Sequence, residues 1–238
     1  MSKLAKALTA AAGNAGGDNL YVEDVFSTYL YTGTGASLPI VNGIDLADAG
    51  GLVWTKRRTS ANSNWFLDSE RGGNQIIRSN TTEAQFTSAG LEITSFNSDG
   101  YTLGTAVDIN SATQDDVSWT FRKAEKFFDV VTYTGDGTTQ TITNGVDLSG
   151  EGGMVWIKCR SYATNNAIQD TVRGGSNILF TNTSAQNQAY STSITSFNSD
   201  GFSLGSETLT NFNAQTFASW TFRKAEKFFD VVTYTWGS

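Results

Sequence analysis

A string of seventeen residues, SWTFRKAEKFFDVVTYT, occurs twice in this chain without a single change, at 118–134 and again at 219–235. Aligning the chain with itself outward from that string gives a period of about 100 residues, the size of a small β-domain rather than of a solenoid repeat. The chain is therefore an array of one module, with copies at 25–126 and 127–227. Because both copies sample the same constraints, a side chain present in only one of them is a weak candidate for a shared function.

Each module consists of short apolar segments separated by turn residues. Corresponding segments are GGLVWTK and GGMVWIK, and ITSFNSDGYTLG and ITSFNSDGFSLG. They are rich in β-branched and aromatic residues, as strands are, and the Asp-Gly pair in SFNSDG is a strong hairpin signal. Helical periodicity is absent from the modules. The sequence thus predicts an all-β fold of two tandem antiparallel β-sandwich domains, with four tryptophans as core anchors: Trp54, Trp119, Trp156 and Trp220.

The first 24 residues form a separate segment. MSKLAKALTAAAG is rich in alanine, with Leu4 and Leu8 one helical turn apart, and glycines follow it. A secretion signal is the alternative interpretation, but Lys6 interrupts a run that is already short for such a signal. We expect 1–24 to form a short N-terminal helix and a Gly-rich hinge that attach the chain to a partner, since a lone helix of this length is marginal in water.

The repeated string also describes the joint between modules. Its alternating residues predict the last strand of one sandwich and the first strand of the next, with only KAEKFFD between them. A short linker without Gly or Pro implies a fixed relation between neighbours, like a stiff chain of beads. By the same reasoning, we expect 228–238 to be the first strand of a truncated third repeat, in which Trp236 replaces the turn glycine Gly135.

Composition excludes several chemistries. The chain has no histidine, so a Ser-His-Asp triad and an imidazole zinc site are ruled out. The single cysteine, Cys159, has Arg57 as its counterpart, which makes a shared thiol nucleophile or metal ligand a weak proposal. A net charge of −7 argues against nucleic acid as the partner, and no stretch is apolar enough for membrane insertion. The sequence points to no cofactor and no metal.

An aspartate and an arginine precede a Gly-Gly pair in both modules: Asp68 with Arg71, and Asp170 with Arg173. A carboxylate and a guanidinium at this spacing can form a bidentate pair across a turn. They are candidates for a polar ligand site, and the simpler interpretation is a structural salt bridge. A glycosidase needs two carboxylates facing one groove. The other acidic candidates, Glu70, Asp115 and Asp116, have Val172, Thr216 and Phe217 as counterparts, so we predict no catalytic residue.

The motifs VWTK and VWIK, DSERGG and DTVRGG, SFNSDG, and SWTFRKAEKFFDVVTYT together resemble a known family. They are similar to the tandem concanavalin-A-like lectin/glucanase modules of virion proteins from marine bacteriophages, especially cyanophages. The resemblance covers nearly the whole chain. It implies a jelly-roll sandwich, a location in the virion and a fold capable of carbohydrate recognition. The acidic motif ExDxxE of the glucanase branch is not present, so no enzymatic activity is expected.

Three functional hypotheses follow. The chain is first interpreted as a phage virion structural protein, a tail fibre or fibre-like appendage that attaches to other virion proteins through 1–24 and uses its modules for host adhesion or as spacers. A homo-oligomer, preferably a homotrimer, is expected. The alternative is a carbohydrate-binding lectin or adhesin module of a cell surface or capsid decoration protein, in which Trp65 and Tyr101 stack on host surface glycans. A glycan-degrading enzyme is the third, which the missing carboxylates disfavour.

Overall fold

The computed structural model describes residues 20–89, 92–125 and 127–235. Within these ranges each module has nine strands and a one-turn helix before its last strand. The first module comprises α2 (Val22–Val25), β1 (Phe26–Thr32), β2 (Leu38–Val41), β3 (Gly51–Arg57), β4 (Trp65–Asp68), β5 (Gly72–Arg78), β6 (Phe86–Thr87), β7 (Ile93–Asn97), β8 (Gly100–Leu103), α3 (Val107–Asn110) and β9 (Asp115–Arg122). The second comprises β10 (Phe128–Thr134), β11 (Gln140–Thr143), β12 (Gly153–Cys159), β13 (Ala167–Asp170), β14 (Asn177–Phe180), β15 (Gln188–Ala189), β16 (Ile194–Asn198), β17 (Gly201–Leu204), α4 (Thr208–Asn211) and β18 (Thr216–Arg223).

Each module is a sandwich of two antiparallel sheets. In the first, a six-stranded sheet with the order β1-β9-β3-β4-β5-β6 packs on a three-stranded sheet with the order β2-β8-β7. The second repeats this with β10-β18-β12-β13-β14-β15 and β11-β17-β16. The register repeats as well, since Trp54 lies opposite Trp119 as Trp156 lies opposite Trp220. The predicted fold of two tandem β-sandwich domains is confirmed.

The core of each module lies between its two sheets. Because successive side chains of a strand point to opposite faces, every second residue of the six-stranded sheet turns inward. Burying one such aliphatic side chain contributes about 1.5–3 kcal/mol to stability. The first core includes Tyr31, Ile40, Val53, Trp65, Leu67, Ile76, Tyr101 and Leu103, and the second includes Ile142, Val155, Ile157, Phe202, Leu204 and Phe217.

The four tryptophans named as core anchors are not in these cores, and that prediction is wrong. Trp156 and Trp220 belong to a third apolar cluster outside both sandwiches, against which Trp54 is packed. Cross-strand partners share a face of the sheet, so Trp119 lies on the same outer face as Trp54. Side chains of the repeated strand alternate between the two faces of the sheet, as expected. The tryptophan, however, lies on the face that points away from the core of its own sandwich.

The joint between modules has the same geometry in both copies of the repeated string. An isolated bridge joins Ala124 to Phe128 in the first copy and Ala225 to Phe229 in the second. The ion pairs Lys123–Asp129 and Lys224–Asp230 both measure 3.1 Å between nitrogen and oxygen. A turn that is hydrogen-bonded and ion-paired in the same way twice supports the predicted fixed relation between neighbours.

Beyond the second joint the two copies differ. FDVVTYT forms β10 in the first copy, paired with β18, whereas residues 230–235 of the second copy form no strand. The expected strand of a third repeat is therefore not formed in the described part of 228–238, because a strand needs a partner for its backbone groups. Trp236 lies outside the described residues.

The helices also differ from expectation. The segment predicted as an N-terminal helix lies mostly outside the described residues, which begin at residue 20. The one-turn helices α2, α3 and α4 were not predicted, because four residues are too few to show a helical period.

Candidate functional site: the face between the modules

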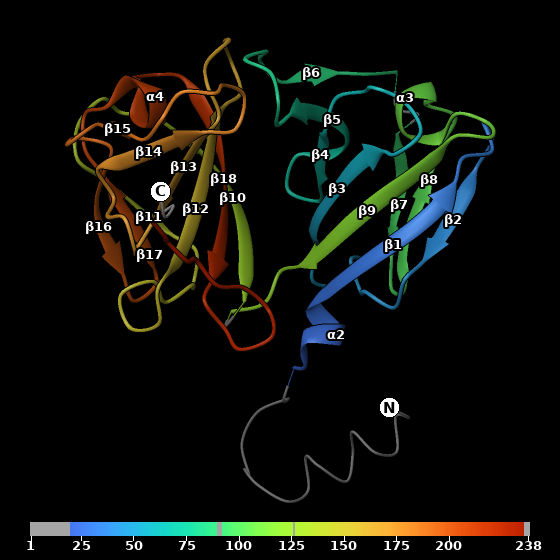
Figure 1. Ribbon diagram of the computed structural model, residues 1–238, viewed down its shortest axis with the longest axis horizontal. Helices are drawn as coiled ribbons and strands as arrows, with labels where there is room; N and C mark the ends of the chain where they lie inside the picture. The colour runs from blue at the N-terminus through green and yellow to red at the C-terminus, as the bar shows by residue number, and fades with distance from the viewer. Residues whose placement is uncertain (1–19, 90–91, 126, 236–238) are drawn as a thin grey trace, which may run out of the picture.

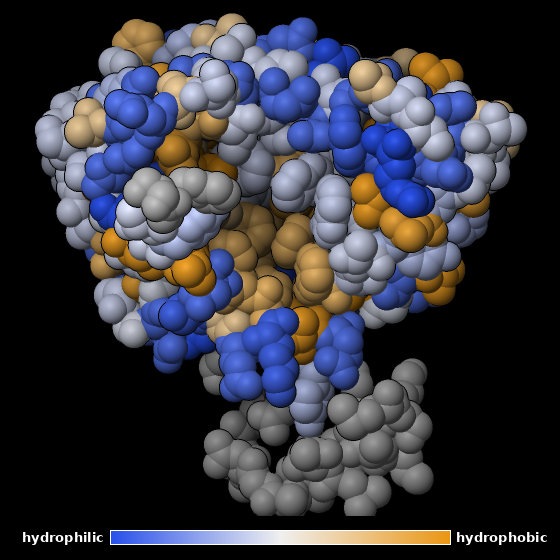
Figure 2. Space-filling model, in the orientation of Figure 1, coloured by the Kyte–Doolittle hydropathy of each residue, from blue (hydrophilic) through white to orange (hydrophobic). Residues whose placement is uncertain are grey.

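The two modules meet through the outer faces of their six-stranded sheets. Figure 1 shows β10 and β18 of the second module turned toward the first, and Figure 2 shows apolar side chains in the hollow between the halves. The buried residues of this shared cluster are Leu52, Phe66 and Ile77 from the first module, and Phe128, Val130, Trp156, Ala218, Trp220 and Phe222 from the second. The modules thus share a core of their own and are not beads joined only by a linker.

Aromatic contacts form the centre of this face. Phe66 meets Trp156 at 4.7 Å and Trp220 at 4.9 Å between ring centroids, both edge to face. Trp54 meets Trp156 in the same manner at 5.8 Å. Such geometry adds about 0.5–1.5 kcal/mol per pair beyond the area buried. These aromatic contacts therefore hold the two modules against each other.

The Asp68–Arg71 pair lies at the edge of this cluster, in the turn between β4 and β5. The backbone N–H of Arg71 donates to Oδ1 of Asp68 at 2.9 Å, and its Nε donates to Oδ2 at 2.7 Å. Gly72, which follows, has φ +96°, a conformation that favours glycine and lets β5 begin directly after the turn. Both side chains are fully buried. The predicted salt bridge is present.

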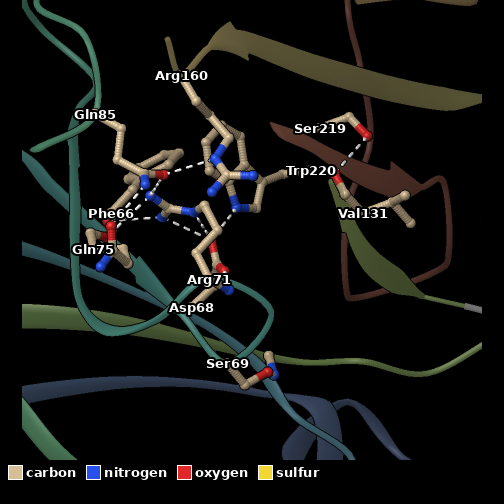
Figure 3. Close-up of polar contacts among 11 residues, drawn as sticks. Phe66, Asp68, Ser69, Arg71, Gln75, Gln85, Val131, Arg160, Ser219 and Trp220 are labelled. Atoms are coloured by element: carbon tan, nitrogen blue, oxygen red, sulfur yellow. Dashed lines mark hydrogen bonds and ion pairs between the residues drawn. The ribbon is translucent and has the colours of Figure 1, made fainter. Parts of the chain in front are cut away.

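The second module completes the surroundings of this pair, as Figure 3 shows. Trp220 donates from Nε1 to Oδ2 of Asp68 at 3.1 Å, and its ring lies 5.4 Å from the Arg71 guanidinium carbon. The remaining guanidinium N–H groups donate to the carbonyls of Phe66 and Gln75, both at 3.0 Å, and to Gln85 at 3.3 Å. The pair is paired and hydrogen-bonded within the protein, as a buried charge has to be.

The corresponding pair of the second module has the same local geometry in a different setting. Arg173 donates from its backbone N–H and from Nε to Asp170, at 2.8 and 2.6 Å. No tryptophan donates to Asp170 in the described residues. The Arg173 side chain is 16% exposed and borders an open groove of about 510 Å³, walled by Met154, Ile168, Leu179 and the segment 229–234. The sequence made both pairs equal candidates for a polar ligand site, but of the two only the Asp170–Arg173 pair is open to solvent.

Polar contacts surround the apolar centre. Arg160 donates from Nε to Gln85 at 2.8 Å, and Asn166 donates to the carbonyl of Thr81 at 2.7 Å. Lys158, on the outer face of β12, donates to the carbonyl of Thr82 at 3.3 Å. Burial between the modules lowers the pKa of Lys158 to about 8. These contacts fix the register of one sheet on the other.

The two aromatic residues proposed for glycan stacking are not at the surface. Trp65 is 2% exposed and Tyr101 is fully buried, and both belong to the core of the first module. That expectation is wrong because Trp65 falls on the inward phase of β4, which its sequence neighbours Phe66 and Leu67 do not reveal.

Two of the residues that the modules do not share, Asp116 and Cys159, lie at the same place in the two modules. Arg57 lies opposite Asp116 in the first module, with Nε 3.5 Å from Oδ1, and Cys159 lies opposite Phe217 at the same place in the second. Burial raises the pKa of Asp116 to about 6, although Arg57 opposes the shift. One module thus has a buried ion pair where the other has an apolar pair. Such pairs can replace each other at a buried position at little cost in stability, so a structural role accounts for these residues.

In the residues that the structure describes, no group of three or more Cys, Asp or Glu side chains is placed to hold a metal ion. None of the helices in the described ranges is long and apolar enough to cross a membrane.

Comparison with known proteins gives one match. No curated protein and no solved structure matches the chain. A family model described as a domain of unknown function, DUF7483, matches residues 22–126 and again residues 123–229. These two matches span nearly all of both sandwiches. The chain therefore belongs to the DUF7483 family and carries its domain twice in tandem.

Proposed function

We propose that this chain is a structural protein of a phage virion, a tail fibre or fibre-like appendage, in which the two modules act as one stiff unit. Residues 1–24 would attach it to other virion proteins, and the assembly would be a homo-oligomer, with a homotrimer as the favoured form. The proposal gives the chain no catalytic role. Its phage origin and the concanavalin-A-like type of the sandwich rest on the resemblance of the repeated motifs.

The observation that carries the structural role is the buried contact between Trp220 and the Asp68–Arg71 pair. It uses a fully buried ion pair of the first module to hold the second, and not to present a site to solvent. A fibre or spacer needs a fixed angle between successive modules, and an interface with an aromatic centre and a polar rim supplies it. The repeated geometry of the joint supports the same conclusion.

Carbohydrate binding receives less support from the same residues. The aromatic and charged groups that would form a sugar site in the first module are buried. Of the two candidate Asp–Arg pairs, the Asp170–Arg173 pair of the second module is the one with a partly exposed side chain. A glycan array probed with the full chain tests this directly, with an Arg173→Met variant as the control. Signal that is lost in the variant would favour the lectin alternative over the structural role.

Immuno-electron microscopy of purified virions, with an antibody raised against the full chain, tests the proposed location. Labelling of tails or appendages, together with the chain in the particle proteome, is the expected result. Absence of the chain from particles, and its recovery from host envelopes, would overturn the virion assignment without affecting the packing of the two modules.

A further inference from the structure

The contact between the modules is heterologous, which means that it joins two different surfaces of the same domain. The first module contributes the Asp68–Arg71 pair, and the second contributes Trp220. The reverse contact, between Trp119 and Asp170, is not among the hydrogen bonds of the described residues. Trp220 is fully buried, whereas its counterpart Trp119 is only half-buried. Each module therefore has one of these two surfaces in the contact between the modules. The other surface lies outside that contact: Trp119 packs on Trp54 of its own sheet at 4.9 Å between ring centroids, and the segment 229–234 borders the Asp170–Arg173 pair.

We propose that a second copy of this chain docks on the second module, placing Trp119 of its first module against the Asp170–Arg173 pair. Copies would then join head to tail through the contact that already joins the two modules within one chain. The inference does not depend on a virion location.

The accepting surface on the second module is already built. The Asp170–Arg173 pair has the backbone and side-chain hydrogen bonds of the Asp68–Arg71 pair. The apolar positions around it are retained, with Ile168 where the first module has Phe66 and Leu179 where it has Ile77. Leu179 is 38% exposed, while Ile77 is fully buried beneath the second module. The surface has the chemistry of the engaged one, and the segment 229–234 borders it where the engaged surface meets a module.

The donating surface lies on the outer face of β1 and β9 in the first module. Thr28 and Leu30 are the counterparts of Val130 and Thr132, and Trp119 lies opposite Thr28 as Trp220 lies opposite Val130. Phe26, at the end of this surface, already packs on Phe121 and on Phe228 of the second joint. Leu30 is 58% exposed and Thr28 is exposed, whereas Val130 is fully buried. An indole N–H, a flat aromatic ring and flanking apolar side chains suit a carboxylate beside a guanidinium.

The segment 229–234 lies over the accepting surface and makes no strand ladder there. Val232 is 74% exposed and Tyr234 is 83% exposed, so little apolar contact holds the end of this segment in place. Its sequence, FDVVTY, repeats the start of β10, and β1 is the corresponding strand of the first module. We therefore expect β1 of the second copy to displace it.

A heterologous contact between identical chains leaves one free surface of each kind, so association closes into a ring or continues as a filament. Sedimentation velocity of the full chain over a range of concentrations tests this. We expect species larger than the monomer to grow with concentration. Leu30→Glu on the donating surface and Leu179→Glu on the accepting surface should each weaken association by about 30-fold or more, the effect typical of losing a central contact.

Val41→Glu is the matched control, because Val41 is also 58% exposed but lies on β2 of the other sheet. It should associate like the unmodified chain. An equimolar mixture of Leu30→Glu and Leu179→Glu gives the sharpest result, since one intact surface of each kind remains. Pairs that stop at two chains are expected.

Three results would overturn the proposal: an unmodified chain that stays monomeric at every concentration, variants that associate as strongly as Val41→Glu, or a mixture that forms no pairs. Trp119→Phe, which replaces the indole with a smaller phenyl ring and removes its N–H donor, tests the contact itself. It should weaken association while leaving the circular dichroism spectrum and the unfolding midpoint of the monomer unchanged.

Discussion

The indole Nε1 of Trp220 donates a hydrogen bond of 3.1 Å to Oδ2 of Asp68, a residue 152 positions earlier in the chain. The bond joins the last strand of one sandwich to a turn of the other, and both groups are fully buried. Its sequence counterpart, Trp119 with Asp170, makes no such bond in the described residues. Two modules with the same strand order and register therefore differ in which of their surfaces takes part in the contact, and substitutions at matched positions should reveal the difference.

Replacing Trp220 with phenylalanine keeps a large ring and removes the N–H donor. Because Asp68 then has one partner fewer in a buried site, we expect the free energy of unfolding to fall by about 1–3 kcal/mol. The same change at Trp119, which is only half-buried, should cost no more than about 0.5 kcal/mol. Urea unfolding followed by circular dichroism measures both. Equal losses at the two positions would contradict the assigned role.

The two arginines give a second matched pair. Arg71→Met leaves Asp68 buried without its charge partner and also removes the donors to Phe66 and Gln75, so a loss of about 3–5 kcal/mol is expected. Arg173→Met affects a side chain that is 16% exposed at an open groove. Water from the groove can therefore reach the position that the guanidinium leaves beside Asp170, whose own side chain is 2% exposed. Its effect on unfolding should be clearly smaller. A larger loss from Arg173→Met would refute this account of the pairs.

Lys158 makes stability depend on pH in the alkaline range. Its pKa is about 8 in the folded protein and returns to its ordinary value of 10.5 on unfolding. Between these two pH values the unfolded chain binds more protons than the folded chain. The contribution of Lys158 to the free energy of unfolding therefore rises with pH from about 8 to 10.5. The rise is at most about 1.4 kcal/mol per pH unit, which is a tenfold change in the unfolding constant.

The Lys158→Met variant should lack this rise. The difference in free energy of unfolding between the variant and the unmodified chain should therefore change with pH across that window. Lys56→Met, at the corresponding position of the first module, is the control for replacing a lysine at this position of the strand. Denaturant unfolding at several pH values provides the measurement. Parallel curves for Lys158→Met and the unmodified chain would count against burial of a charged amine at the face.

The chain itself suggests a replacement in the core of the first module. Arg57 and Asp116 form a buried ion pair where the second module has Cys159 and Phe217. Changing both, to cysteine and phenylalanine, should be neutral or raise stability by about 1–4 kcal/mol, whereas Arg57→Cys alone should lower it by about 3–5 kcal/mol. Thermal unfolding of the three proteins distinguishes these outcomes. A double variant less stable than the single one would exclude a simple exchange of core pairs.

The sequence was sufficient to predict the modules, the strands that flank the joint and the Asp–Arg pairs, because a repeat and a period of two are local signals. It was not sufficient to predict which face of a strand is inside. Trp65, Phe66 and Leu67 are consecutive apolar residues and are all buried, since both faces of β4 are covered. An uninterrupted run of apolar residues does not show which of them face the core, and for this reason the sequence did not reveal that Trp65 points inward.

The same limit explains the tryptophans of the repeated strand. Trp119 and Trp220 have identical sequence neighbours over sixteen positions, yet one is half-buried and the other fully buried. The difference arises from the neighbouring module and not from local sequence. A buried third cluster between two sandwiches leaves no signal in the sequence other than an excess of aromatic residues on the outer face.

A distance distribution between the two modules tests whether they form one packed unit. Spin labels at Val107→Cys and Val172→Cys would occupy exposed positions, 67% and 50% accessible, one in each module, while the native Cys159 is buried. Pulsed electron paramagnetic resonance should give a single narrow distribution, which broadens when Phe66 and Trp220 are both changed to alanine. A distribution that is already broad in the otherwise unmodified chain would show that the modules are joined by a flexible linker and would contradict the account.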